Sequence, residues 1–198
     1  ANLQKIEPAS ALEEFRKGLT ASGPKAKLRA EYARFQLGLG EIGQARSMIE
    51  AAKAENADLI DVQIADGQVA AAQGQPAASL AAFEQVLKSR PANRVALLGR
   101  IAALGDMSRL DEAEEYLQAM AAPSGDIDYA FLAANIASQR GDWDKARQTL
   151  QPLEVRLKDK PEVEMLYGMA LSKTGQPQQA MSRLSPLMSK YPNSRSLR

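Results

Sequence analysis

The first residues that could do chemistry form a glycine-rich run, G-x-G-x-x-G, at Gly38, Gly40 and Gly43. In a dinucleotide-binding protein this run follows a β-strand and lets the backbone approach a pyrophosphate. Here the preceding residues, 26–37, have the pattern of a helix, and no alternating strand pattern is visible. The context favours a glycine turn over a nucleotide site, so no cofactor is expected.

A group of carboxylates is the second candidate, at Asp111, Glu112, Glu114 and Glu115. Paired carboxylates can bind a metal or act as acid and base, but acidic residues are also favoured early in a helix by its dipole. The chain has no histidine and no cysteine, which removes the usual nucleophile–base pairs and the commonest transition-metal ligands. We interpret the group as a solvated helix face and expect neither catalysis nor a metal site.

Composition narrows the kind of partner. The 198 residues carry 25 Lys and Arg against 24 Asp and Glu, a net charge of +1, so no charge excess attracts nucleic acid or a lipid surface. No apolar run reaches the ~18 residues that a membrane-spanning helix needs. We therefore expect a protein or peptide partner, no nucleic acid, and no membrane insertion.

The elements that would position any site are helical hairpins, and residues 161–194 form the clearest one. Gly175 suits the end of a first helix, because glycine enters the left-handed backbone region at little cost. Pro177 suits the first turn of a second helix. The apolar stripe of that helix follows the i, i+4, i+7 spacing of Ala180, Leu184 and Leu187. One hairpin cannot bury both its apolar faces, so stacked neighbours are expected.

The same landmarks recur at steps of 34 residues, with one step of 33. The turn between the two helices falls at Gly40, Gly74, Ser108, Gly141 and Gly175. A small residue early in the second helix falls at Ala45, Ser79, Ala113, Ala146 and Ala180. Larger side chains follow four residues later at Ile49, Phe83, Leu117, Leu150 and Leu184, and the next buried position is Ala52, Val86, Met120, Leu153 and Leu187. This recurrence is typical of a stacked-repeat architecture.

The pattern resembles the tetratricopeptide repeat (TPR) family over nearly the whole chain. The family's glycine at position eight matches Gly67 and Gly168, and its later alanine and proline match Ala180 and Pro192. The family's early tryptophan is missing from every repeat, and Ser108 replaces a turn glycine. The resemblance implies an all-α, right-handed superhelical solenoid of antiparallel helix pairs.

The implied organisation is a single TPR array over residues 1–198. It comprises a partial repeat at 1–25, full repeats at 26–59, 60–93, 94–126, 127–160 and 161–194, and the start of a truncated repeat at 195–198. Residues 8–15 align with residues 76–83 at an offset of two repeat lengths. We therefore expect the chain to be a fragment of a longer, bacterial TPR protein.

The resemblance also implies a binding groove, because the first helix of each hairpin lines the inner face of a TPR superhelix. The candidate groove residues stand at its fifth and ninth positions: Arg34, Ile64, Gln68, Leu98, Phe131, Asn135, Met165 and Met169. Their apolar area suits an apolar or amphipathic segment, and Gln68 and Asn135 can pair with a partner backbone. The alternative is that these side chains pack against the next repeat.

A known peptide site of the family, the carboxylate clamp for chaperone C-termini, does not fit. It requires a basic residue at position five and asparagine at position nine of one repeat. The first repeat offers Ala30 and Arg34 instead, and the third offers Leu98 and Ala102. We therefore exclude that kind of co-chaperone role.

The sequence thus predicts a non-catalytic protein–protein interaction scaffold with a segment bound in its concave groove. Its alanine- and glutamine-rich style is similar to bacterial envelope scaffolds, such as those of polysaccharide secretion, pilus or outer-membrane protein assembly, which favours the periplasm over the cytoplasm. Two alternatives stay open. One is an array that self-associates through an uncapped C-terminal surface around Leu184, Leu187 and Met188. The other is a regulatory TPR arm of a larger enzyme.

Overall fold

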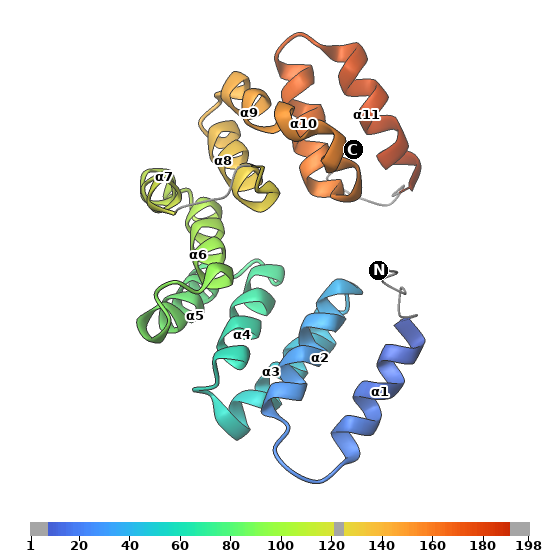
Figure 1. The fold of residues 1–198 in the computed structure, drawn as a ribbon, viewed down its shortest axis with the longest axis vertical. Helices are drawn as coiled ribbons and strands as arrows, with labels where there is room; N and C mark the ends of the chain where they lie inside the picture. Colours follow the sequence, from blue (N-terminus) through green and yellow to red (C-terminus); the bar gives the residue numbers. More distant parts are fainter. Residues whose placement is uncertain (1–7, 121–124, 191–198) are drawn as a thin grey trace. The chain divides into compact units, whose positions relative to one another are not determined.

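A computed structural model describes residues 8–120 and 125–190, and within these ranges it is entirely helical (Figure 1). The α-helices are α1 (Pro8–Thr20), α2 (Ala26–Gly38), α3 (Ile42–Asn56), α4 (Ile60–Ala72), α5 (Pro76–Ser89), α6 (Arg94–Asp106), α7 (Leu110–Ala119), α8 (Ile127–Gln139), α9 (Trp143–Leu150), α10 (Pro161–Lys173) and α11 (Pro177–Lys190). A 3₁₀ segment, η1 (Gln151–Asp159), follows α9 directly. The features expected at residues 1–5 and 195–198 lie outside the described residues.

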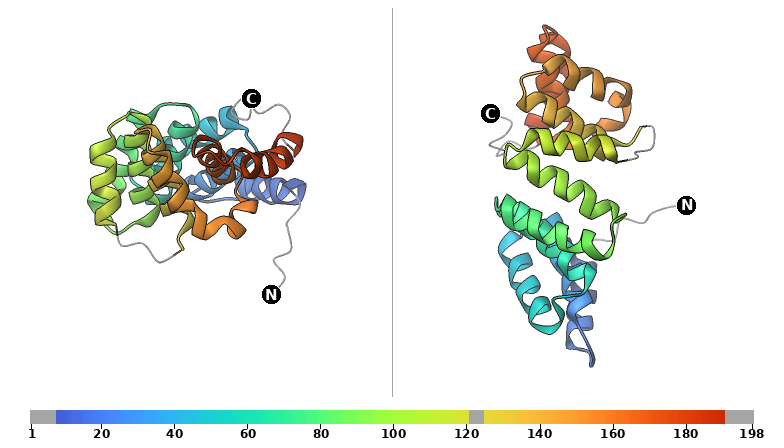
Figure 2. Two further views of the ribbon diagram at one scale, coloured as in Figure 1. Left: turned by 90° about the horizontal axis from the view of Figure 1, so that it is seen from above. Right: turned by 90° about the vertical axis from the view of Figure 1, so that its left-hand side faces the viewer.

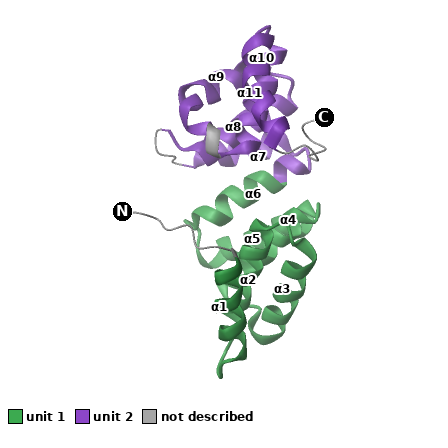
Figure 3. Ribbon diagram, turned by 90° about the vertical axis from the view of Figure 1, so that its right-hand side faces the viewer, with its two compact units in different colours: residues 1–103 green, residues 104–198 purple. Residues whose placement is uncertain are grey.

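The chain divides into two compact units, residues 1–103 and 104–198, and the division falls within α6 (Figure 3). Unit 1 holds α1 to α5 and most of α6. Unit 2 holds the end of α6 and everything from α7 to α11. The single array predicted for the whole chain stays a prediction, and each unit is described by itself.

The five predicted turn positions are confirmed. Each has a positive φ: Gly40 79°, Gly74 69°, Ser108 58°, Gly141 79° and Gly175 80°. After each turn residue, the next N–H donates to a carbonyl five residues back, as in Glu41 to Gln36 and Gln176 to Leu171, both 2.9 Å. This is the Schellman arrangement that satisfies the last carbonyls of a helix. Among the described residues Ser108 is the only non-glycine with positive φ.

The core of unit 1 is made largely of alanines on α2, α3 and α4. Ala30, Ala45 and Ala52 are fully buried, and Ile49 and Val62 supply the larger side chains. Small side chains allow the three helices to contact one another closely. Figure 2 shows these helices, coloured blue to teal, side by side.

A carboxylate from the end of α3 holds the beginning of α2. The Lys25 N–H donates to Glu55 Oε1 over 2.5 Å, and Arg29 pairs with Glu55 Oε2. The Lys25 N–H contributes most to holding the pKa of Glu55 below its usual value, and the Ala26 N–H and Arg29 act in the same direction. Glu55 therefore caps a helix whose own N-cap residue, Lys25, has no capping side chain.

Phe83 of α5 occupies the space that two glycines leave. A Cβ placed on Gly67 of α4 would come within 2.9 Å of the Phe83 ring, and one on Gly99 of α6 within 2.3 Å. The ring is 3% exposed and packs with Ile64 and Val86. The glycines therefore allow a large side chain to lie directly against two helix backbones.

In unit 2, α8, α9, η1, α10 and α11 share one core. Its larger members include Leu150, Leu157 and Leu171, each at most 1% exposed, and Phe131 and Trp143 pack against it. The second helix of the fourth repeat departs from the regular pattern, because α9 ends at Leu150 and continues as η1. Pro152 stands at the start of η1 and has no N–H for an α-helical hydrogen bond.

Candidate protein-interaction surface

The predicted groove residues of unit 1 lie in different environments. Arg34 on α2 is exposed, while Gln68 on α4 and Leu98 on α6 are half-buried. The Oε1 of Gln68 is buried and accepts no hydrogen bond from the described residues.

Ile64 differs from the expectation of an open groove residue. It is 8% exposed and forms a core cluster with Phe83, Val86 and Ala96. Its side chain is covered because Phe83 and the small Ala96 pack around it. Ile64 therefore packs against neighbouring helices, which is the alternative to an open groove position.

In unit 2 the predicted residues come from two helices that contact each other, α8 and α10. Phe131 and Asn135 are one turn apart on α8, and Met165 and Met169 are one turn apart on α10, so each pair shares a helix face. Phe131, Asn135 and Met165 are half-buried, and Met169 is 39% exposed. We name these four residues the α8–α10 face.

The α8–α10 face carries one adaptable polar group. Asn135 Oδ1 accepts from Gln139 Nε2 over 3.3 Å, and the Asn135 carbonyl accepts from Ser138 Oγ over 2.8 Å. Neither contact uses the amide N–H groups of Asn135, which leaves them to donate to a partner's carbonyl. The face therefore combines aromatic and thioether surface with a hydrogen-bonding group.

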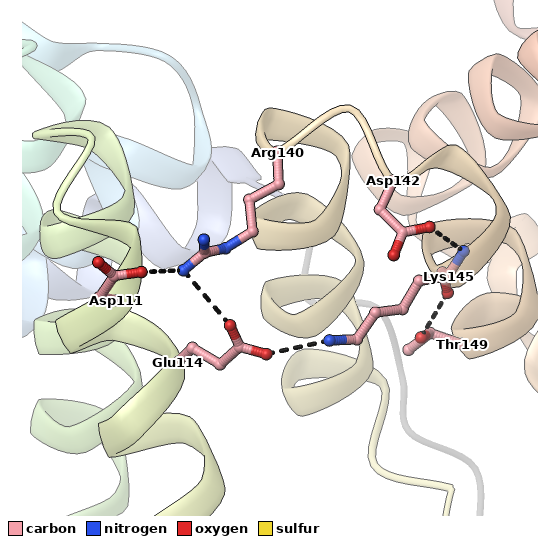
Figure 4. A network of polar contacts seen from close by, with 6 residues as sticks. All are labelled: Asp111, Glu114, Arg140, Asp142, Lys145 and Thr149. Atoms are coloured by element: carbon pink, nitrogen blue, oxygen red, sulfur yellow. Dashed lines mark hydrogen bonds and ion pairs between the residues drawn. The ribbon is translucent and has the colours of Figure 1, made fainter.

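The carboxylate group singled out in the sequence takes part in ion pairs between helices of unit 2 (Figure 4). Glu114 on α7 lies 3.4 Å from Arg140 and 3.0 Å from Lys145, and Arg140 also pairs with Asp111. The hydrogen bond from Arg140 to Asp111 is the main cause that raises the pKa of Arg140. Figure 4 also shows Asp142 accepting from the Lys145 N–H at the start of α9, over 3.0 Å.

These contacts give the acidic residues a structural role. Glu112 is held separately by Arg109, at 2.7 Å, and this hydrogen bond lowers the pKa of Glu112. Within residues 8–120 and 125–190, no group of three acidic, histidine or cysteine side chains is placed to hold a metal ion. Nor does any helix of that part of the chain have the length and apolar character to cross a bilayer.

Sequence reasoning missed a buried carboxylate, Glu164 on α10. It is 5% exposed and accepts from Arg183 of α11 at 2.8 Å, while the second terminal nitrogen of Arg183 reaches Glu154 of η1 at 2.9 Å. In the sequence Glu164 looks like Glu162, another acidic residue in the first turn of the same helix. Only the fold brings Arg183 and Glu154 to it, so no local signal could have distinguished the two.

No family model and no curated protein sequence matches the chain. Solved structures do match it. The type IV pilus biogenesis factor PilW is 18% identical, with a TM-score of 0.71 over 96% of this chain and 89% of that one. TTC0263, a thermophilic TPR protein of Thermus thermophilus, is 16% identical, with a TM-score of 0.72 over 87% of this chain and 94% of that one.

A third match is YrrB, described as a TPR protein with an unusual peptide-binding site. It is 15% identical to this chain, with a TM-score of 0.52 over 97% of this chain and 96% of that one. Together with the confirmed turns and the buried small residues, these similarities define the class of protein. The chain has the tetratricopeptide-repeat fold, an all-α solenoid of antiparallel helix pairs.

Proposed function

We propose that the chain is a non-catalytic scaffold that binds an apolar or amphipathic protein segment, and that the α8–α10 face is its main contact. The observation that carries this is Met169, a large apolar side chain that is 39% exposed on α10, a helix that contacts the α8 of Phe131 and Asn135. A partner would cover this surface and gain the free energy of burying apolar area, ~25 cal/mol per Å².

The chemistry of the face suits a helix or an extended strand as partner. Methionine side chains adapt to different apolar shapes, and Phe131 offers a rigid aromatic surface. Asn135 fixes the register of a bound backbone through a hydrogen bond. In unit 1, Arg34, Gln68 and Leu98 provide a second contact surface of mixed polarity, without Ile64.

The fold neighbours support a scaffold and suggest where it works. PilW is a pilus biogenesis factor and YrrB has a peptide-binding site. We therefore propose a role in a bacterial envelope assembly, with pilus biogenesis ahead of polysaccharide secretion and outer-membrane protein assembly, and with the periplasm as the compartment.

The test is a matched pair of substitutions, Met169→Glu on the α8–α10 face and Met181→Glu on α11. Both methionines are exposed, at 39% and 61%, so neither change should unfold the protein. Phe131→Glu is less suitable, because Phe131 also packs against the core. Proteins from an envelope lysate would be captured on each variant and identified by mass spectrometry, and circular dichroism would check the fold.

The proposal expects a partner that is retained by the wild type and by Met181→Glu but lost with Met169→Glu. A partner retained equally by all three proteins would remove the α8–α10 face as the binding site. The captured partner would then be tested as a purified segment against the same variants, so that direct binding is measured.

Self-association is the second candidate, favoured by the exposure of Met181 and Met188 on α11, 61% and 47%. Leu187, which the sequence places on this surface, is only 7% exposed, so the 47% exposed Met188 is the better probe. Sedimentation equilibrium should show a mass that increases with concentration and falls in the Met181→Glu, Met188→Glu double variant. A monomer at all concentrations would rule this candidate out.

A further inference from the structure

A surface cavity of ≈510 Å³ lies between α10 and α11, and none of the four residues of the α8–α10 face is among its lining residues. It is lined by Glu164, Ser182, Arg183, Pro186 and Leu187. All five belong to unit 2. The volume is in the range of sites that hold a small ligand or a partner side chain.

The cavity wall contains a buried carboxylate that is only half satisfied. Glu164 Oε1 accepts from Arg183 at 2.8 Å, but Glu164 Oε2 accepts no hydrogen bond from the described residues. The residue is 95% buried, since its exposed fraction is 5%. A buried acceptor without a hydrogen-bond donor is unfavourable, and more so when it is charged. A hydrogen-bond donor in the cavity would remove that cost.

The charged lining residues of the cavity are Glu164 and Arg183. Arg183 is shared between two carboxylates, Glu164 at 2.8 Å and Glu154 of η1 at 2.9 Å. Arg147, which also lies near Tyr167, is paired with Asp144 at 3.5 Å. Each terminal nitrogen of Arg183 already donates to a carboxylate, whereas Glu164 Oε2 accepts no hydrogen bond from the described residues. A cation is the complementary ligand.

The carbonyl of Ser182 is a second acceptor. Its usual helical donor would be the N–H four residues later, but that residue is Pro186, which stands inside α11 and has no N–H. The Ser182 hydroxyl donates to the Gln179 carbonyl over 2.8 Å, and its oxygen can still accept. Carboxylate, carbonyl and hydroxyl oxygens at one cavity suit a group with several N–H donors, such as an ammonium or guanidinium.

Tyr167, which is buried beside the lining residues, positions Arg183, and two lining residues form an apolar wall. The guanidinium carbon of Arg183 lies 4.7 Å from the Tyr167 ring centroid, which holds the arginine over the aromatic face. Burial is the largest cause that raises the pKa of Tyr167, followed by the charge of Glu154, so the phenol stays neutral. Pro186 and Leu187 offer apolar surface to the methylene stem of a long basic side chain.

We propose that this cavity is a binding site for a lysine or arginine side chain of a protein partner, with Glu164 as the acidic acceptor. It is separate from the groove, and its occupation does not depend on the proposed function of the α8–α10 face. A basic residue outside an apolar segment would anchor there and add specificity to a partner that carries one.

The test is an NMR titration of the ¹⁵N-labelled chain with three probes that share a similar stem. Nα-acetyl-lysine amide and Nα-acetyl-arginine amide carry the cation, and Nα-acetyl-norleucine amide does not. The two cationic probes should shift the amide signals of residues 163–165, 182–185 and 187, and their comparison identifies the preferred head group. The norleucine probe should not, and added salt should weaken the binding.

Glu164→Gln keeps a hydrogen-bonding side chain for Arg183 but removes the charge. It should weaken the cationic probes about tenfold or more, since a hydrogen bond to a charged group is worth ~1.5–3 kcal/mol. Glu162→Gln is the matched control, because Glu162 is an exposed acid on the same helix, and it should bind like the wild type.

Ser182→Phe gives a second test that leaves the carboxylate in place. Ser182 is exposed at the cavity, so a phenyl group there should occlude it with little effect on folding. If Glu164→Gln fails to fold, this variant decides. Equal binding of the norleucine probe, or cation binding that survives both Glu164→Gln and Ser182→Phe, would overturn the proposal. Met169→Glu should leave probe binding unchanged, which distinguishes this site from the groove.

Discussion

The position of Phe83 leads to a prediction in which two physical effects of opposite sign compete. Gly99→Ala replaces a helical glycine, which by propensity alone would stabilise the protein by ~1 kcal/mol. The added Cβ would lie 2.3 Å from one carbon of the Phe83 ring and 2.5 and 2.6 Å from two others. The ring cannot withdraw easily, because it also lies close to α4, where a Cβ on Gly67 would come within 2.9 Å of it.

The clash should outweigh the gain in helix propensity. Overpacking of a tight core costs ~1–3 kcal/mol, and contact at 2.3 Å with a clamped ring belongs at the upper end of that range. We expect a net loss of about 1–2 kcal/mol. Urea unfolding followed by circular dichroism measures it as a lower midpoint with an unchanged slope.

Gly43→Ala is the matched control, since a Cβ on Gly43 of α3 meets nothing within 4 Å. It should be neutral or stabilising by up to ~1 kcal/mol. In a Phe83→Leu background, the cost of Gly99→Ala should shrink, and this coupling isolates the contact. If Gly99→Ala stabilises the protein as Gly43→Ala does, the close approach of Phe83 to α6 is refuted.

Three further predictions concern the turns, the α2 cap and the core. Ser108→Gly should stabilise the protein by about 1 kcal/mol in urea unfolding, because a left-handed non-glycine residue is strained; a decrease would show that the serine side chain is needed. Glu55 has a lowered pKa, so the stability that it contributes is present above its unfolded pKa and is lost as the pH falls through the folded one. The difference in urea midpoint between wild type and Glu55→Gln should therefore be largest at pH 7 and disappear below about pH 4. A difference that does not depend on pH would contradict the capping role. Leu150→Ala should cost ~2–5 kcal/mol, because Leu150 is fully buried, whereas Gln148→Ala at an exposed position should change the midpoint little.

Features that depend on one repeat could be predicted from the sequence. The positive φ at Gly40, Gly74, Gly141 and Gly175, and even at Ser108, follows from the phase of the pattern. The small residues early in each second helix are all buried, from Ala45 at 0% to Ala180 at 3%. Local propensity and packing agree at these positions, so the spacing alone was enough.

Features that depend on contacts between repeats could not be predicted in the same way. Ile64 occupies the same repeat position as Phe131, yet Ile64 is buried and Phe131 is half-buried. The difference comes from Phe83 and Ala96, which cover Ile64 and stand 19 and 32 residues along the chain. Which groove positions stay open is decided by the sizes of such neighbours, and a periodic pattern does not contain that information.

The acidic residues show the same limit. Asp111 and Glu114 looked like members of one solvated group, but their side chains are 94% and 28% exposed. Glu114 is drawn inward because Arg140 and Lys145 approach it from the next hairpin. Ion pairs between residues some 30 positions apart cannot be seen in a helical pattern. The sequence therefore predicted a solvated acidic helix face but not its ion pairs.

The 3₁₀ segment η1 connects the motion of the backbone to the Glu164 cavity. Its nine residues exceed the 3–4 over which 3₁₀ hydrogen bonds usually persist, so η1 is a weak point where amide protons of unit 2 should exchange with solvent early. Glu154 stands on this segment and holds Arg183. Each local opening of η1 would release Glu154 from Arg183. The share of the arginine's charge that neutralises Glu164 would then change, and with it the attraction of the cavity for a basic side chain.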